Sequence, residues 1–342
     1  MQIQLLQWYD QVKRDLPWRK TKDPYGIWVS EIMLQQTRAE TVCGYWTRFM
    51  AQFPTVQALA GAPEQDVLKA WEGLGYYSRA RNLRKCAQVV SSEYDGHFPA
   101  DVDLLRKLPG IGDYTAGAVG SIAFGIRTPA VDGNVERVVS RLKGIREDVG
   151  IPSVKRHLRA QADSLVPEDR PGDFNQAMME LGARICQPAP RCSDCPVSAF
   201  CDACDAGDAD ALPVKQRKAP QRVVPKGVAL VFHEDRVLLY QREERLLQGL
   251  WCFPGFDHDT DPASIERHLH KLGIHATYTA DLGEAKHVFT HLIWDMTLLR
   301  FDASSPACPE GWRWANAREL DDLPLPTAMK VARAKVGEIL GK

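Results

Sequence analysis

A glycine-rich turn is the first feature of this sequence whose residue types could do chemistry. The stretch LPGIGDYTAG, residues 108–117, places three glycines and one proline between two segments of helical periodicity. Gly110 and Gly112 can adopt positive φ, so backbone N–H groups stay uncovered at the start of the following helix. Such groups bind anions. The turn, which includes Pro109, therefore either binds a phosphate group or is only a tight connection between two helices.

Two acidic residues occupy helical contexts of different kinds. Asp132, in AVDGNVERVVSRL, precedes an apolar-periodic helix and is predicted to cap its N-terminus. A carboxylate in that position keeps a low pKa, which suits it to stabilise a developing cation. Glu31, in DPYGIWVSEIMLQQT, lies on a helix that Asp23 caps and Pro24 begins. By itself, Glu31 could still be an exposed surface residue.

The cysteines are clustered. Five of the nine fall between Cys186 and Cys204, in ICQPAPRCSDCPVSAFCDAC, which favours a metal site over a disulfide framework. The first four of them, Cys186, Cys192, Cys195 and Cys201, form C-x5-C-x2-C-x5-C. The last four form C-x2-C-x5-C-x2-C, which resembles a compressed zinc site and uses Cys204 in place of Cys186.

More than one domain must position these residues, because 342 residues exceed a typical single domain. The apolar content of 44% and the charged content of 25% are those of an ordinary globular protein. With 43 basic and 44 acidic residues, the net charge does not favour nucleic acid, so such a partner must bind a local patch. Without a signal peptide or a long apolar run, we expect neither secretion nor membrane spanning.

The period of the apolar residues changes along the chain. From Met1 to about Arg184 it is helical, which predicts an all-α half. Residues 209–225, ADALPVKQRKAPQRVVP, contain three prolines and no apolar period, which predicts an extended linker. Beyond it, β-like runs such as GVALVFH alternate with helical runs such as PTAMKVARAKVGEIL, which predicts an α+β domain.

The stretch LPGIGDYTAGAVGSIAFGIRTPAVDGNVERV resembles the helix-hairpin-helix superfamily of base-excision DNA glycosylases, which includes endonuclease III. The stretches LPWR, WVSEIMLQQT and GLGYYSRARNL narrow the resemblance to adenine DNA glycosylases of the MutY type, over nearly the whole chain. The resemblance implies a multidomain fold. An all-α helix-hairpin-helix glycosylase domain with an iron-sulfur cluster loop (1–208, loop 186–204) is followed by a linker (209–225) and an α+β Nudix-like domain (226–342).

The resemblance also implies catalytic roles. The residue matching Glu31 protonates N7 of adenine, and the residue matching Asp132, with Asn134 beside it, stabilises the oxocarbenium-like sugar and the attack of water. Desolvation should raise the pKa of Glu31, while Asp132 should stay ionised. Tyr114 stands where relatives that cleave the strand carry a lysine, so no Schiff base can form. We therefore expect a monofunctional glycosylase, with Tyr114 lining the pocket near the sugar.

A flipped base leaves a gap that must be filled. The resemblance makes Tyr76 a wedge into the duplex and Gln36 the residue that fills the gap, and GLGYYSRARNLRK adds Arg79 and Arg81 as DNA contacts. Without the resemblance, a run of charges such as this is more often a solvated helix face. The residues expected to line the adenine pocket are Arg14, Trp18, Arg19, Leu34, Gln36 and Glu180.

The C-terminal part, with GVALVF and GLWCFPGF, resembles the Nudix fold, whose members hydrolyse nucleoside diphosphates with paired metal-binding glutamates. His270 and Lys271 stand where those glutamates belong, so we expect this domain to bind rather than cut. The resemblance makes HVFTHLIW the loop that recognises 8-oxoguanine, through Phe289, Thr290 and His291. The alternative for this segment is a plain β-strand with a buried phenylalanine.

For the cysteines, the family pattern is C-x6-C-x2-C-x5-C around a 4Fe-4S cluster. The first loop of this chain is one residue shorter, and we favour the cluster over zinc. The sequence thus predicts an enzyme that removes adenine paired with 8-oxoguanine or guanine from double-stranded DNA, as a monomer in the bacterial cytoplasm on the nucleoid, without a membrane partner. The alternatives are an endonuclease III-like glycosylase for another base and a non-catalytic damage-binding protein.

Overall fold

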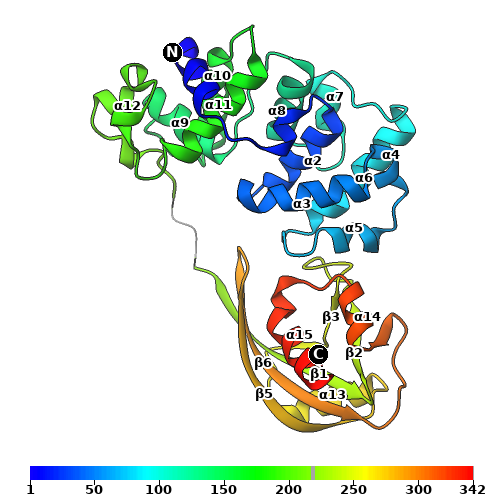
Figure 1. The fold of residues 1–342 in the computed structure, drawn as a ribbon. Helices are drawn as coiled ribbons and strands as arrows, with labels where there is room; N and C mark the ends of the chain where they lie inside the picture. The colour runs from blue at the N-terminus through cyan, green and yellow to red at the C-terminus, as the bar shows by residue number, and fades with distance from the viewer. Residues whose placement is uncertain (217–219, 342) are drawn as a thin grey trace. The chain divides into compact units, whose positions relative to one another are not determined.

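The computed structural model describes residues 1–216 and 220–341, which form two compact units (Figure 1). One unit comprises Met1–Gly61 with Asn82–Lys218, and the other comprises Ala62–Arg81 with Ala219–Lys342. The predicted domain boundaries at residues 208 and 226 remain predictions. The predicted linker is too long, because its residues 222–225 belong to the first β-strand. Arg217 and Lys218 of that linker, and the terminal Lys342, lie outside the described residues.

The first unit is helical, as the apolar period predicted. Helix α6 (Ser78–Glu93) begins in the second unit and continues into the first. The other helices of the first unit are α1 (Gln2–Val12), η1 (Pro17–Lys20), α2 (Pro24–Leu34), α3 (Ala39–Gln52), α4 (Val56–Gly61), α7 (Val102–Lys107), α8 (Asp113–Phe124), α9 (Gly133–Leu142), α10 (Pro152–Leu165), α11 (Pro171–Arg184), η2 (Cys192–Asp194), η3 (Ser198–Phe200), α12 (Asp202–Asp205) and η4 (Ala209–Ala211).

Helix α2 lies at the centre of this unit. Its start is the predicted one: the Asp23 carboxylate accepts hydrogen bonds from the N–H groups of Tyr25 (3.1 Å) and Gly26 (3.4 Å), and Pro24 occupies the first turn. Every residue from Tyr25 to Met33 is buried, against α8 and α3 among other elements. A helix apolar on all sides is stable only inside a core, so Glu31 is carried into the interior.

The predicted helical hairpin is formed by α7 and α8, and its turn corrects one expectation. Gly110 has a φ of 77°, and a Cβ there would lie 2.7 Å from the Cβ of Asn82, so this position requires glycine. Gly112 was expected to share this conformation, but its φ is −94° and its backbone is extended. It is the N-cap of α8, and a Cβ there would meet open space. Only one of the two glycines is needed for a left-handed turn.

The second unit contains a mixed sheet, which confirms the predicted α+β class. Strand β1 is central, in the order β3-β2-β1-β6-β5, with β4 paired to β1 and β7 to β2. β1 and β6 run parallel, and β5 and β6 form an antiparallel hairpin. The elements are α5 (Glu64–Ala70), β1 (Arg222–His233), β2 (Arg236–Gln241), β3 (Trp251–Cys252), β4 (Gly255–Asp257), α13 (Pro262–Lys271), β5 (Ala276–Val288), β6 (Leu292–Ala303), β7 (Trp312–Ala315), α14 (Ala317–Asp322), η5 (Thr327–Met329) and α15 (Lys330–Ile339).

Alternate residues of β1 and β6 feed two apolar cores, one on each face of this sheet. Leu230 and Leu298 belong to the core that also contains Leu320 of α14 and Val336 of α15. Val231 and Leu299 belong to the core that contains Ile265 and Leu269 of α13. The sheet is therefore covered by helices on both sides.

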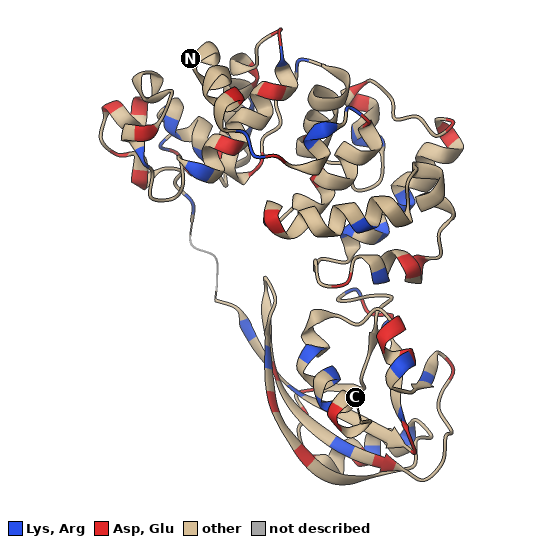
Figure 2. Ribbon diagram, viewed as in Figure 1, with Lys and Arg blue, Asp and Glu red and all other residues tan. Residues whose placement is uncertain are grey.

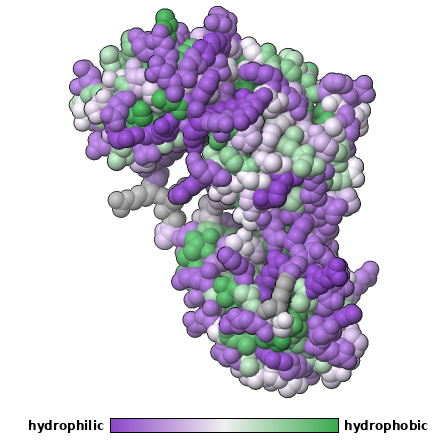
Figure 3. Space-filling view, in the orientation of Figure 1, coloured by the Kyte–Doolittle hydropathy of each residue, from purple (hydrophilic) through white to green (hydrophobic). Residues whose placement is uncertain are grey.

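Lys and Arg residues are interleaved with Asp and Glu residues along the chain in both units (Figure 2). On the face seen in Figure 3, hydrophilic residues dominate and apolar residues show as separate patches. None of the described helices is long and apolar enough to span a bilayer.

Candidate active site

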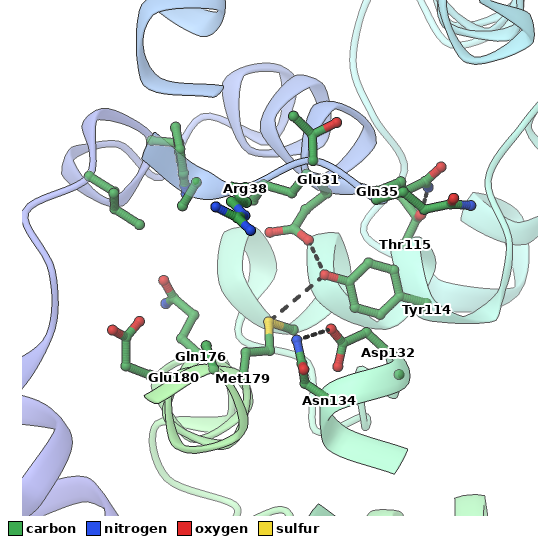
Figure 4. A pocket seen from close by; sticks show the side chains of 18 of the residues that line it. Glu31, Gln35, Arg38, Tyr114, Thr115, Asp132, Asn134, Gln176, Met179 and Glu180 are labelled. Carbon is green, nitrogen blue, oxygen red and sulfur yellow. Dashed lines mark hydrogen bonds between the residues drawn. The ribbon is translucent and has the colours of Figure 1, made fainter. Parts of the chain in front are cut away.

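A cleft of about 1050 Å³ in the first unit brings together most of the residues predicted for catalysis and adenine binding (Figure 4). It is lined by residues of η1, α2, α3, α8, α9 and α11, by the segments that precede η1 and α3, and by Gln187. Its lining includes the predicted residues Arg14, Trp18, Arg19, Glu31, Leu34, Gln36, Gly112, Tyr114, Asp132, Asn134 and Glu180.

Glu31 is the buried carboxyl of this cleft, with 4% of its surface exposed. The Tyr114 hydroxyl donates a hydrogen bond to its Oε2. The pKa of Glu31 is raised to about 7, because burial, aided by the charge of Asp132, outweighs the lowering by the Tyr114 hydrogen bond and by Arg19. A carboxyl group with such a pKa is a suitable proton donor near neutral pH, as the sequence predicted.

Tyr114 extends from the first turn of α8 toward Glu31 and the sulfur of Met179, which lies 3.8 Å from its hydroxyl (Figure 4). Burial, Glu31 and Asp132 together raise the pKa of Tyr114 well above 10. The side chain therefore stays a neutral phenol that can donate one hydrogen bond. This places it beside the two carboxyl groups, as expected for a residue that lines the pocket.

Asp132 caps α9 as predicted: its Oδ1 accepts from the Val135 N–H at 2.7 Å, and its Oδ2 accepts from Asn134 Nδ2 at 3.2 Å. The expected low pKa is wrong. Burial raises the pKa of Asp132 above its ordinary value, and the hydrogen bonds from Val135 and Asn134 and the charge of Arg137 oppose that rise. Desolvation outweighs the helix terminus here because the cap lies inside the cleft.

Glu180, which was predicted to line the adenine pocket, organises another wall of the cleft. It is 1% exposed on α11, and its carboxylate accepts from Arg14 Nε (2.8 Å) and Arg19 Nη2 (2.9 Å). Arg19 also donates to Gln176 at 3.2 Å, while Trp18 packs edge-on against Trp46. The buried carboxylate thus fixes two guanidinium groups at the rim, and these can orient a polar heterocycle.

The two residues predicted to enter the duplex share an unusual backbone. Gln36 has a φ of 61° and Tyr76 a φ of 48°, and both side chains are exposed. Left-handed conformations in non-glycine residues are costly and concentrate at functional sites. In the second unit, the Tyr76 hydroxyl lies 2.8 Å from the hydroxyl of Thr290.

Of the two arginines predicted to contact DNA, Arg79 has its guanidinium group buried inside the protein. Arg79 is only 9% exposed, and its guanidinium donates to the carbonyl groups of Leu74 (3.0 Å) and Gly75 (3.1 Å). Burial lowers its pKa to about 10. Arg79 therefore holds the loop that carries Tyr76 rather than presenting its charge to DNA. Arg81 is half-buried and donates to the carbonyl of Gln248 at 2.5 Å.

The predicted recognition loop is the turn between β5 and β6 rather than a plain strand. Phe289 is half-buried, with its ring 4.8 Å from that of Trp294 and 4.5 Å from that of His287. Thr290 and His291 are exposed at the tip. The Phe289 N–H donates to the Leu292 carbonyl at 2.9 Å and closes the turn. The aromatic ring anchors the turn while the two polar side chains stay accessible.

Comparison with known proteins identifies the family. The HhH-GPD superfamily of base excision DNA repair proteins matches residues 29–167, and the NUDIX domain matches residues 227–335. The chain is 36% identical to the adenine DNA glycosylase of Homo sapiens, across 95% of this chain and 72% of that protein. It is 38% identical to that of Mus musculus, across 95% and 76%. The chain belongs to the adenine DNA glycosylase family.

A solved structure agrees with the fold of the helical part. A thermostable thymine-DNA glycosylase is 31% identical to this chain, covers 60% of it with 95% of its own length, and has a TM-score of 0.54. The family, its helix-hairpin-helix domain and its Nudix-like domain were therefore predicted correctly from the sequence.

In this member of the adenine DNA glycosylase family, the five clustered cysteines line one small cavity. Among residues 1–216 and 220–341, no group of three or more His, Cys, Asp or Glu side chains is arranged to hold a single metal ion. Thiols spread around a cavity are a suitable donor set for an iron-sulfur cluster.

Three residues of this region escaped the sequence predictions: Arg137, Gln176 and Met179. Arg137 lies one turn after Asn134 on α9 and donates to Asn134 Oδ1 (2.9 Å) and to the Cys186 carbonyl (2.7 Å). Gln176 and Met179 lie within one turn of Glu180 on α11 and line the cleft. Helical spacing of three or four residues from a predicted site residue was the available signal.

Proposed function

We propose that this chain is a monofunctional DNA N-glycosylase that removes adenine paired with 8-oxoguanine or guanine from double-stranded DNA. One observation supports it most: a buried carboxyl group, Glu31, with a pKa raised to about 7, lies in the same cleft as the helix-capping Asp132. Two carboxyl groups in different surroundings can supply a proton and a negative charge at the same pH.

The chemistry follows from these two groups. Glu31, protonated, donates its proton to N7 of the flipped adenine, so that the C1′–N9 bond breaks with its electron pair going to the base. The sugar is left with a positive charge that the Asp132 carboxylate, held by Val135 and Asn134, stabilises. Water then adds to C1′ and loses a proton to a carboxylate, which completes hydrolysis.

Tyr114 limits the reaction to base removal. Its phenol has no amine to form a Schiff base with C1′, and its hydrogen bond goes to Glu31. Tyr114 therefore orients the proton donor, and the strand is left intact.

The turn of Phe289, Thr290 and His291 is the proposed reader of 8-oxoguanine. Two exposed polar side chains on a turn anchored by Phe289 against Trp294 can hydrogen-bond a modified base edge. In the same unit, α13 carries His270 and Lys271 at the positions of the missing metal-binding glutamates. A lysine cannot ligate a divalent cation while protonated, so we propose recognition without hydrolysis of nucleotides.

We further propose a 4Fe-4S cluster held by Cys186, Cys195, Cys201 and a fourth thiolate from the same cavity. Such a cluster would supply a structural cross-link of the loop after α11. Arg137 donates to the carbonyl of Cys186 and to Asn134, so the chain itself connects this loop to the residue beside Asp132.

Single-turnover cleavage of DNA duplexes tests the proposed activity. Adenine opposite 8-oxoguanine and opposite guanine should be excised, while thymine opposite guanine, the substrate suggested by the thymine-DNA glycosylase likeness, should not. Glu31→Gln and Asp132→Asn should each slow excision by about 100-fold or more. The control is Glu168→Gln, which alters a carboxylate that is 88% exposed. Fully active Glu31 and Asp132 variants, or inert adenine substrates, would overturn the assignment.

A further inference from the structure

The cavity proposed for the cluster contains one thiol more than a cluster with four thiolate ligands needs. Cys186, Cys192, Cys195, Cys201 and Cys204 all line it. The loop between the first two is the one that is a residue shorter than the family pattern. The inference that follows rests on the proposed cluster, and it concerns which of the five thiols bind it.

The Cys186 end of the short loop is held firmly. Arg141, 1% exposed, donates to Cys186 Sγ (3.3 Å) and to the carbonyl groups of Gln187 (2.6 Å) and Pro188 (2.9 Å). Arg137 donates to the Cys186 carbonyl at 2.7 Å. A missing residue therefore cannot be accommodated by moving this end without breaking buried hydrogen bonds to charged donors.

Two other thiols are also fixed. Cys201 Sγ lies 3.4 Å from the Arg141 carbonyl oxygen, and both Cys195 and Cys201 pack, with Cys186, against the apolar core around Val138. Cys192 does not belong to that group. It packs, together with Cys201, against a second small cluster of Ala203, Ala209 and Leu212. The shortened loop thus has its effect at Cys192.

Cys204 is the fifth thiol of the cavity. It is on the short helix α12, one turn after Cys201, where its N–H donates to the Cys201 carbonyl at 3.0 Å. Cys192 and Cys204 both line the cavity. Both side chains are half-buried. Neither of these two thiols packs against the apolar core that holds the other three.

We propose that Cys192 and Cys204 are interchangeable as the fourth thiolate ligand, while Cys186, Cys195 and Cys201 are obligatory. The exchange moves no electrons. The incoming thiol loses its proton to water as its sulfur binds iron, and the outgoing thiolate takes up a proton as its bond to iron breaks. The fifth cysteine compensates for the short loop, because either of two neighbouring sulfurs can complete the set.

Ligand variants of the full chain, purified without oxygen, test the proposal through iron content, acid-labile sulfide and visible absorbance. Wild type should hold about four irons per chain. Cys192→Ser and Cys204→Ser should each keep more than about half of that iron. Cys192→Ser/Cys204→Ser and the control Cys195→Ser should each lose it about tenfold. Circular dichroism of each variant reports whether it has folded.

The possible outcomes distinguish a failure of the proposed ligand interchange from a failure of the proposed cluster itself. Wild-type protein without iron and sulfide contradicts the cluster itself. Wild type with a cluster that Cys192→Ser loses as fully as Cys195→Ser shows that Cys204 is no ligand. Loss in Cys204→Ser with retention in Cys192→Ser makes Cys204 a fixed ligand. Either result overturns interchange.

Alkylation of the folded wild-type protein tests the same point without any variant. A thiol bound to iron resists iodoacetamide, so peptide mass spectrometry should find about one labelled thiol among the five. The label should be divided between Cys192 and Cys204. Label on Cys204 with none on Cys192, or on any of the other three cysteines, would contradict the proposal.

Discussion

At the scale of single residues, the proposed acid is one carboxyl group whose pKa the fold raises to near neutrality. Glu31 is buried on α2, and its pKa is raised from 4.5 to about 7 by desolvation. Only Tyr114 and Arg19 oppose that rise, whereas Asp132 has two hydrogen-bond donors and Arg137. The two carboxyl groups therefore differ in how well their charged forms are compensated.

The first prediction is the pH dependence of excision. Because Glu31 must be protonated to act, the single-turnover rate should fall about tenfold per pH unit above about pH 7. A rate that stays flat from about pH 6 to about pH 9 would remove Glu31 from the role of acid.

The second prediction concerns stability and the same group. Folded Glu31 binds its proton more tightly than unfolded Glu31, so its stabilising contribution is present below about pH 4.5 and is lost as the pH rises to about 7. Glu31→Gln removes this loss. The free energy of unfolding of the variant, relative to wild type, should rise by up to about 3 kcal/mol between about pH 4 and about pH 8, measured by urea denaturation. An unchanged difference would contradict the burial of an ionisable group.

The third prediction tests whether Tyr114 sets the pKa of Glu31 or only supports the structure of the pocket. Its hydrogen bond lowers the pKa of Glu31. Tyr114→Phe should therefore move the alkaline limb of the pH–rate profile upward, while leaving the ring in place. A limb that moves downward would contradict the assigned contact. Thermal melting provides the folding control.

At the scale of elements, the α7–α8 turn offers a matched pair of glycines. Gly110→Ala forces a Cβ into a left-handed conformation and against Asn82, whereas Gly112→Ala meets open space with extended backbone. Gly110→Ala should cost about 1–2 kcal/mol or more of stability and weaken DNA binding, and Gly112→Ala should cost less than about 1 kcal/mol. Urea denaturation and DNA affinity at fixed salt measure both. Equal effects would contradict the turn geometry.

At the scale of the whole molecule, excision and recognition of the opposite base are assigned to different units. Thr290→Val on the β5–β6 turn should reduce the preference for 8-oxoguanine over guanine by about 5- to 10-fold, the worth of one hydrogen bond. The rate on adenine opposite guanine should stay the same. Thr277→Val, on an exposed strand position, is the control. A loss on both substrates would mean that the turn serves excision itself.

The sequence by itself determined the helical and α+β halves, the cap at Asp23, the hairpin and the residues gathered in the cleft. The halves, the cap and the hairpin follow from local rules of periodicity, capping and turn chemistry, whereas the residues of the cleft were implied by the resemblance to the glycosylase family. Only the tertiary structure decided how charged groups are solvated. The sequence predicted an ionised helix cap at Asp132, but burial raises the pKa of that carboxyl group. It predicted a DNA contact at Arg79, but the Arg79 guanidinium donates to the carbonyl of Leu74. Desolvation and hydrogen-bond partners depend on residues far apart in the chain, so spacing along the sequence cannot supply them.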